Sequence, residues 1–183
     1  MVKEEARNVP DAELVRLAKG GDREALDELC ARHVASVYRM CRGILGDDDE
    51  AADATQDCFV KAVRSLHRFR GDASFRTWLL TIAGNEAKGF FRKRKRRAEQ
   101  ALESAGPLFS DHPEAGDVTA LKQEAEQARV MVAELPTKQR LAVRLRIDEG
   151  LSFREIGEII GSSEGAARVN YHHGIRRLRE MMT

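Results

Sequence analysis

Two side chains near the C-terminus have the chemistry that reads DNA bases. Arg168 and Asn170 fall within a predicted helix that runs from Ser163 to Met182. Arginine can donate two hydrogen bonds to guanine, and asparagine can bond bidentately to adenine. Arg176 and Arg177, further along, are better suited to backbone phosphates. The segment predicts DNA contact, and the simpler alternative is a charged helix face that only meets water.

A second group of candidate DNA ligands surrounds the basic run from Arg92 to Arg97. With Lys88, this run concentrates positive charge where DNA phosphates could displace condensed counterions. Aromatic rings and an amide, which proteins use to hold an unstacked base, stand nearby as Phe69, Phe75, Trp78 and Asn85. Phe75 and Trp78 also fit an apolar helical stripe, and a place in the core is the favoured interpretation for both. Melted DNA is therefore a candidate ligand.

Metal binding and catalysis find little support in the residues. Cys30 and His33 lie one helical turn apart, so a metal pair is conceivable, but both fall on an apolar stripe where small core residues belong. The three cysteines contain no C-x-x-C pair and are expected to be reduced. Neither a Gly-rich phosphate loop, an H-E-x-x-H motif nor a recognisable Ser-His-Asp set occurs. We expect no cofactor, no metal and no enzymatic activity.

Amphipathic helices must position these groups. Apolar residues recur at helical spacing after Asp22, a predicted N-cap, and stop at Gly46. The acidic cluster 47–50 suits the positive end of a second helix, and a break at 69–72 precedes a third that runs into the basic run. No segment alternates like a strand. The predicted fold class is all-α, with two small helical bundles joined by a flexible acidic linker.

The second bundle should contain a helix-turn-helix. Ser152 and Glu155 form a capping box, Gly161 can end that helix in a left-handed conformation, and Ser163 can cap the next. Upstream, glycines, prolines and acids follow one another without a helical period, as in a chain that cannot order itself. The predicted division is a first domain over 10–97, a flexible linker over 98–118 and a helix-turn-helix domain over 119–183.

Charge and hydropathy indicate the class of protein. The net charge is only +1, but the basic run is followed by an acid-rich stretch over 99–126, and such local segregation governs binding. No apolar run approaches the roughly eighteen residues of a membrane span, and the polar start lacks the hydrophobic stretch of a secretory signal. We expect a cytoplasmic protein without membrane insertion.

Several segments resemble the extracytoplasmic-function (ECF) RNA polymerase sigma factors of the sigma-70 family. Residues 53–64 resemble the D-x-x-Q-[ED]-x-F-x-x-A-x-R helix of that family, and residues 69–79 resemble the segment that follows it. Leu135-Pro136, Glu149–Ser152 and the turn at 161–163 fall where the family's region 4 would have them. The resemblance spans Asp11 to Met182. It identifies 10–97 with sigma region 2 and 119–183 with sigma region 4.

The resemblance implies a transcription initiation factor. It would bind core RNA polymerase through the β′ clamp helices and the β subunit, melt and capture the minus-ten promoter element, and read the minus-thirty-five element. An anti-sigma factor is a further implied partner. The implied polymerase-binding residues are Asp53, Gln56, Asp57 and Lys61; the minus-ten residues are Phe69, Ser74, Arg76, Asn85, Lys88, Arg92 and Lys93; the minus-thirty-five residues are Ser163, Arg168, Asn170, His173, Arg176 and Arg177.

Two departures and one alternative accompany this resemblance. Gly84 stands where an arginine or another long residue is common, and with Gly89 it places two glycines in one helix, each costing up to about 1 kcal/mol relative to alanine. The recognition helix also differs from the family pattern, so its target sequence can differ. The alternative is a helix-turn-helix regulator with a helical sensing or dimerisation domain, which explains only the C-terminal half.

Overall fold

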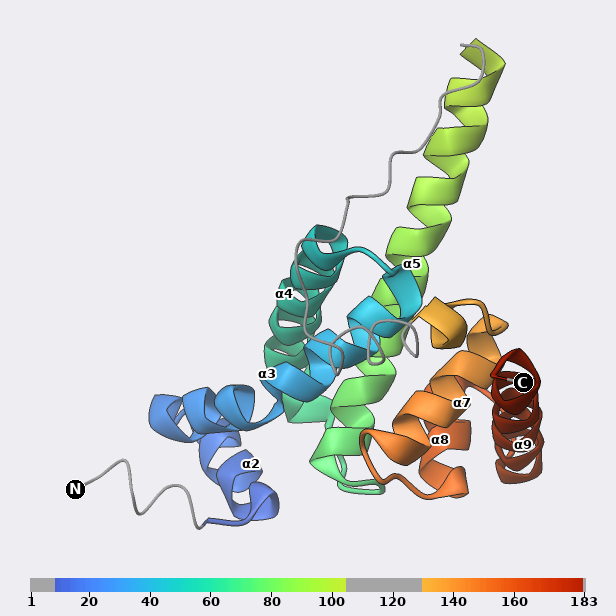
Figure 1. Cartoon of the computed structure of the whole chain (residues 1–183). Helices are drawn as coiled ribbons and strands as arrows, with labels where there is room; N and C mark the ends of the chain where they lie inside the picture. The colour runs from blue at the N-terminus through green and yellow to red at the C-terminus, as the bar shows by residue number, and fades with distance from the viewer. Residues whose placement is uncertain (1–8, 105–129, 183) are drawn as a thin grey trace, which may run out of the picture.

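The computed structural model describes residues 9–104 and 130–182 of the chain. Within these ranges every regular element is a helix and no β-strand occurs (Figure 1). The predicted all-α fold class is therefore confirmed. None of the described helices combines the length and the apolar composition that a membrane span needs.

The N-terminal bundle packs three long helices around one core. Its elements are α2 (Asp11–Lys19), α3 (Arg23–Leu45), α4 (Asp48–Ser65), a 3-10 turn η1 (Leu66–Arg68) and α5 (Phe75–Ser104). Helix α3 contacts both α4 and α5, and α4 contacts α5. Leu29, Cys41, Cys58 and Leu79 are fully buried between them. Removing these apolar stripes from water is the main force that holds the bundle together.

Local sequence explains where these helices begin and end. The Asp22 carboxylate accepts a hydrogen bond from the Ala25 amide at 3.1 Å, and Gly46 ends α3 with φ of 75°. Both were predicted. Helix α2 was not, although Pro10 and the acids Asp11 and Glu13 are typical of a helix start.

The C-terminal bundle is a helix-turn-helix backed by a third helix. It contains α7 (Thr137–Ile147), α8 (Phe153–Ile160) and α9 (Glu164–Met181), and the predicted Ser152–Glu155 capping box is present. Gly161 ends α8 with φ of 68°, and a Cβ on Gly157 would lie 2.9 Å from the Ser162 carbonyl oxygen. Glycine at 157 therefore lets the turn fold tightly back on α8.

Helix α5 is longer than the sequence predicted. It continues to Ser104, so residues 98–104 are helical and do not belong to the linker predicted to begin at Ala98. The segment Ala98–Ser104 is rich in alanine, glutamate, glutamine and leucine, which extend a helix already formed at low cost. The rest of the predicted linker, 105–118, lies outside the described residues.

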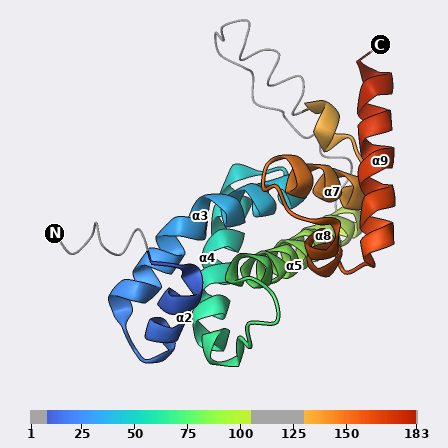
Figure 2. The same cartoon turned by 90° about the horizontal axis from the view of Figure 1, so that it is seen from below.

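The two bundles pack against each other. Helix α8 lies on α5 and α7 lies on α3, and apolar residues from both bundles form one continuous core (Figures 1 and 2). A Cβ on Gly84 would lie 3.0 Å from Met40 Cε and 3.7 Å from the Ile159 carbonyl oxygen. The absence of a long side chain at position 84 thus lets α8 approach α5, which gives this unusual glycine a packing role.

Candidate nucleic-acid and polymerase interfaces

Helix α9 presents its basic residues to solvent. Ser163 caps the helix by accepting a hydrogen bond from the Ala166 amide at 3.2 Å. The Arg168 side chain is 55% exposed, pairs with Glu164 at 3.0 Å and lies 4.9 Å from the Phe153 ring centroid. The ring and the carboxylate hold the guanidinium on the outer face of the helix, where a DNA groove can reach it.

The other residues of α9 that are predicted to contact DNA differ in whether their side chains are already hydrogen-bonded within the protein. The Asn170 amide donates to the Ala166 carbonyl at 2.8 Å, so reading a base requires that this bond be exchanged. His173, Arg176 and Arg177 are exposed and line an open polar groove of about 440 Å³. Gln139, which sequence reasoning missed, lines the same groove from α7.

The aromatic residues near α5 form a cluster. Phe69 lies 5.9 Å from Phe75 and 5.2 Å from Trp78 between ring centroids. Phe75 is buried, so its favoured core role is confirmed, whereas Phe69 is half-buried at the edge. Lys19 of α2 donates to the Phe69 carbonyl at 2.5 Å and lies 5.8 Å from its ring. Helix α2 therefore braces the loop that carries Phe69.

Ser74 and Asn85, two of the minus-ten residues that the resemblance implies, lie far apart along α5. Ser74 caps α5 by accepting from the Thr77 amide at 3.1 Å. Asn85 lies three turns further along the helix, roughly 16 Å away at 1.5 Å per residue. It lines a different groove of about 460 Å³, together with Lys61, Ser65, Ile82, Glu86 and the basic residues Arg64, His67 and Arg68. These last three were missed, although their basic character beside the aromatic loop was visible in the sequence.

The basic side chains toward the C-terminal end of α5 lie in different environments. Arg92 and Lys93 are exposed, as phosphate ligands must be. Arg94 instead donates to Glu50 at 2.8 Å and ties α5 to the start of α4. Lys88 is half-buried in the seam between the bundles, where burial and the nearby Lys138 and Arg92 lower its pKa.

The outer face of α4 carries unpaired acidic groups. Asp53, Gln56 and Asp57 are exposed, while Ala54 and Cys58 face the core. Across residues 9–104 and 130–182, none of these three polar side chains has a hydrogen bond or ion pair. Lys61, at the end of the same face, pairs with Glu86 at 2.6 Å. The face is therefore available to a basic partner.

Arg76 is engaged by the other bundle. Its guanidinium pairs with Glu149, which lies in the turn between α7 and α8. Thr77, the next residue, donates to Glu155 of α8 at 3.0 Å. A predicted minus-ten residue is therefore covered in this arrangement.

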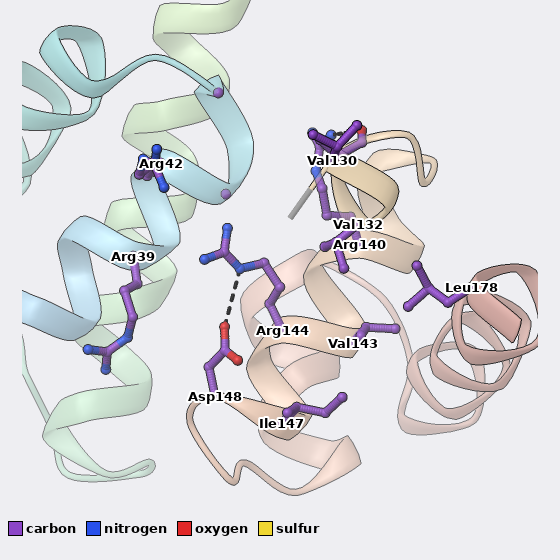
Figure 3. Close-up of a pocket in the computed structure, with 13 residues that line it drawn as sticks. Arg39, Arg42, Val130, Val132, Arg140, Val143, Arg144, Ile147, Asp148 and Leu178 are labelled. Carbon is purple, nitrogen blue, oxygen red and sulfur yellow. Dashed lines mark hydrogen bonds and ion pairs between the residues drawn. The ribbon is translucent and has the colours of Figure 1, made fainter. Parts of the chain in front are cut away.

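An arginine-lined groove of about 540 Å³ lies between α3 and α7 (Figure 3). Its lining combines Arg39, Arg42, Arg140 and Arg144 with Val130, Val132, Val143, Ile147 and Leu178. Burial and the neighbouring Arg144 lower the pKa of Arg140, and its Nε is buried without a hydrogen-bond partner within the described part of the chain. Sequence reasoning did not find this groove, because its α3 wall lies more than 80 residues before the residues of the opposite wall.

The cysteines lie in apolar surroundings. Burial raises the pKa of Cys41 to about 11 and that of Cys58 to about 12, so both are neutral thiols near pH 7. His33 is buried and bonds to Asp11 through Nε2 at 2.7 Å, which joins α2 to α3. Among the residues described, no group of three or more histidine, cysteine or acidic side chains is arranged to hold a metal ion.

Comparison with known proteins gives consistent matches. Residues 29–97 match the family model of sigma-70 region 2, and residues 125–178 match that of sigma-70 region 4. The RNA polymerase sigma-H factor of Pseudomonas aeruginosa is 33% identical over 86% of each chain. The ECF RNA polymerase sigma-E factor of Haemophilus influenzae is 31% identical over 97% of this chain and 95% of its own.

Solved structures share the fold. CnrH, in complex with the cytosolic domain of CnrY, superposes with a TM-score of 0.71 at 23% identity, over 94% of this chain and 96% of its own. RpoE of Bartonella quintana, in complex with the anti-sigma factor NepR, gives a TM-score of 0.68 at 23% identity, over 85% of this chain and 95% of its own.

Proposed function

The chain belongs to the ECF sigma factors of the sigma-70 family, and from this premise we propose which of its residues contact RNA polymerase and promoter DNA. As a member of that family it is a transcription initiation factor that directs RNA polymerase to promoters. It acts by binding, and the residues below supply the contacts.

Region 4 reads the minus-thirty-five element through α9. The observation that supports this is the outward position of Arg168, His173, Arg176 and Arg177 on a capped helix of a helix-turn-helix. The N-terminal part of such a helix enters the major groove, so Arg168 meets base edges and the later arginines meet phosphates. Ser163, which caps α9, and Asn170 lie in the same N-terminal part of this second helix of the helix-turn-helix, and they are the remaining residues proposed to contact the minus-thirty-five element.

Region 2 holds the minus-ten element along α5. Phe69 is half-buried at the edge of the aromatic cluster, and its aromatic ring can stack on an unpaired base. Asn85 lies in a groove with four basic side chains, those of Lys61, Arg64, His67 and Arg68, which suits a base and its phosphate. Arg92 and Lys93 would hold the neighbouring backbone by charge.

RNA polymerase docks on the outer face of α4. Asp53, Gln56 and Asp57 offer two carboxylates and an amide that have no partners within the described residues. Basic residues on polymerase would pair with them, and charge complementarity of this kind chiefly sets the association rate and the specificity. Lys61 must exchange its ion pair with Glu86 to take part.

An anti-sigma factor is a further partner, as it is for the RpoE relative. The groove of Figure 3 has the chemistry for an acidic amphipathic segment, with four arginines beside exposed Val130 and Ile147. Replacing Ile147 and Arg144 by aspartate should raise transcription from the target promoters in cells that contain the inhibitor. No change in such cells would exclude the groove as the inhibitor site.

Reconstitution tests the function directly. Adding the purified chain to sigma-free bacterial core RNA polymerase should give promoter-specific transcripts from a library of random promoter sequences. A helix-turn-helix regulator would bind duplex DNA without polymerase and give no transcripts. Failure to bind core polymerase would overturn the proposal.

A further inference from the structure

One buried carboxylate of region 4 is held by three donors of region 2. Glu149 accepts from Ser36 Oγ at 2.8 Å, from Arg39 Nε at 2.7 Å and from Arg76. Only 4% of the Glu149 side chain is exposed. Burial alone would raise its pKa, but the hydrogen bonds from these donors lower the pKa below its ordinary value, so the group is an anion. The donors therefore form an anion site.

This anion site is built by region 2 itself. Arg39 Nη2 donates to Ser36 Oγ at 3.1 Å, which organises two of the three donors without help from Glu149. Arg76 comes from α5, two residues after Ser74 and on the helix that carries Arg92 and Lys93. Two guanidinium groups and a hydroxyl around one acceptor suit a phosphate as well as a carboxylate.

We infer that Ser36, Arg39 and Arg76 bind a backbone phosphate of single-stranded promoter DNA, and that Glu149 occupies this site when the two regions are packed together. The inference rests on the proposed role of region 2 in holding the minus-ten strand. Region 4 must then leave region 2 before the strand can bind fully, because one site cannot hold both anions.

The test compares two substitutions that change the charge equally. Glu149→Gln removes the anion from the site, whereas Asp148→Asn removes an exposed carboxylate, at the C-cap of α7, that pairs with Arg144 of α7 at 3.2 Å. Each full-length variant is titrated against a fluorescein-labelled single-stranded oligonucleotide of random sequence and about twelve nucleotides, a length within the range that small domains cover. Fluorescence anisotropy at low salt gives the affinity.

Glu149→Gln should bind the oligonucleotide about tenfold more tightly than Asp148→Asn. The reason is that the form in which region 4 has left region 2, and the phosphate site is free, is no longer rare. Adding Arg39→Ala to Glu149→Gln should remove this gain. The salt dependence of binding should be steeper for Glu149→Gln than for the same variant with Arg39→Ala, because each phosphate contact adds about 0.7 to the magnitude of the slope of log affinity against log salt for single strands. Equal affinities for Glu149→Gln and Asp148→Asn would overturn the inference, as would a gain that survives Arg39→Ala.

A second variant covers the case in which Glu149→Gln fails to fold. Thr77→Val breaks the bond to Glu155 and leaves the phosphate site intact. Small-angle scattering should show a larger radius of gyration, and the oligonucleotide should bind more tightly than it does to the unchanged chain. A larger radius without tighter binding would overturn the site. Since no polymerase is present, these results are independent of whether the chain directs transcription.

Discussion

At the scale of single residues, Arg168 is the most informative position on the recognition helix. If it forms a bidentate contact with one base, Arg168→Ala should lose roughly 1 to 3 kcal/mol of discrimination at a single base pair. Binding to a library of duplex promoter variants measures this. Arg154→Ala is the matched control, because Arg154 is exposed on α8 and has a comparable helix partner, Glu158, at 3.5 Å. A uniform loss across all sequences would assign Arg168 to a phosphate.

The cysteines make a second residue-scale prediction. With pKa values of about 11 and 12, Cys41 and Cys58 have almost no thiolate at pH 8, and both are fully buried. Cys30 is half-exposed, and burial raises its pKa as well. Titration with a thiol reagent at pH 8 should label Cys30 first, and the other two only after denaturation. Rapid labelling of all three in the folded chain would contradict this.

At the scale of elements, the basic end of α5 separates DNA contact from packing. Replacing Arg92 and Lys93 by alanine should lower the salt slope of duplex binding by about 0.9 for each lost phosphate contact. Arg94→Ala removes one positive charge from the same basic run but also breaks the ion pair with Glu50, so it should lower the thermal stability of the free chain. An unchanged slope in the Arg92 and Lys93 variant would show that these side chains are merely solvated.

Capping residues explain why the elements were largely predictable and why their mutual contacts were not. Asp22, Gly46, Ser152 and Gly161 act within a few residues of their own position, so the local sequence carries the information. The Glu149–Arg76 pair joins residues 73 positions apart, and no local pattern encodes it. The same holds for Asn85: its type suggested base contact, but only the packing of α4 on α5 revealed the basic groove around it.

At the scale of the whole molecule, Gly84 controls how closely the two bundles approach. Gly84→Ala should be tolerated, because its Cβ is tight only against the flexible end of Met40 and lies at ordinary contact distance from Ile159, and it should gain up to about 1 kcal/mol of helix stability. Gly84→Arg, the kind of long side chain common in this family, should collide with α8 and separate the bundles. Small-angle scattering should show a larger radius of gyration for the Gly84→Arg variant and no increase for the Gly84→Ala variant. Equal compactness of both variants would show that the seam adapts to a long side chain.

The core shared across the seam has a consequence for the lifetime of the protein. Leu80 of α5 and Ile156 of α8 belong to one apolar cluster, so the packed chain should unfold in a single cooperative transition. A three-helix bundle on its own buries too little apolar surface to be more than marginally stable. Separation of the two regions therefore exposes region 4 to local unfolding and to proteases. Chains whose regions have separated but that have not bound polymerase should be degraded before chains that are still packed.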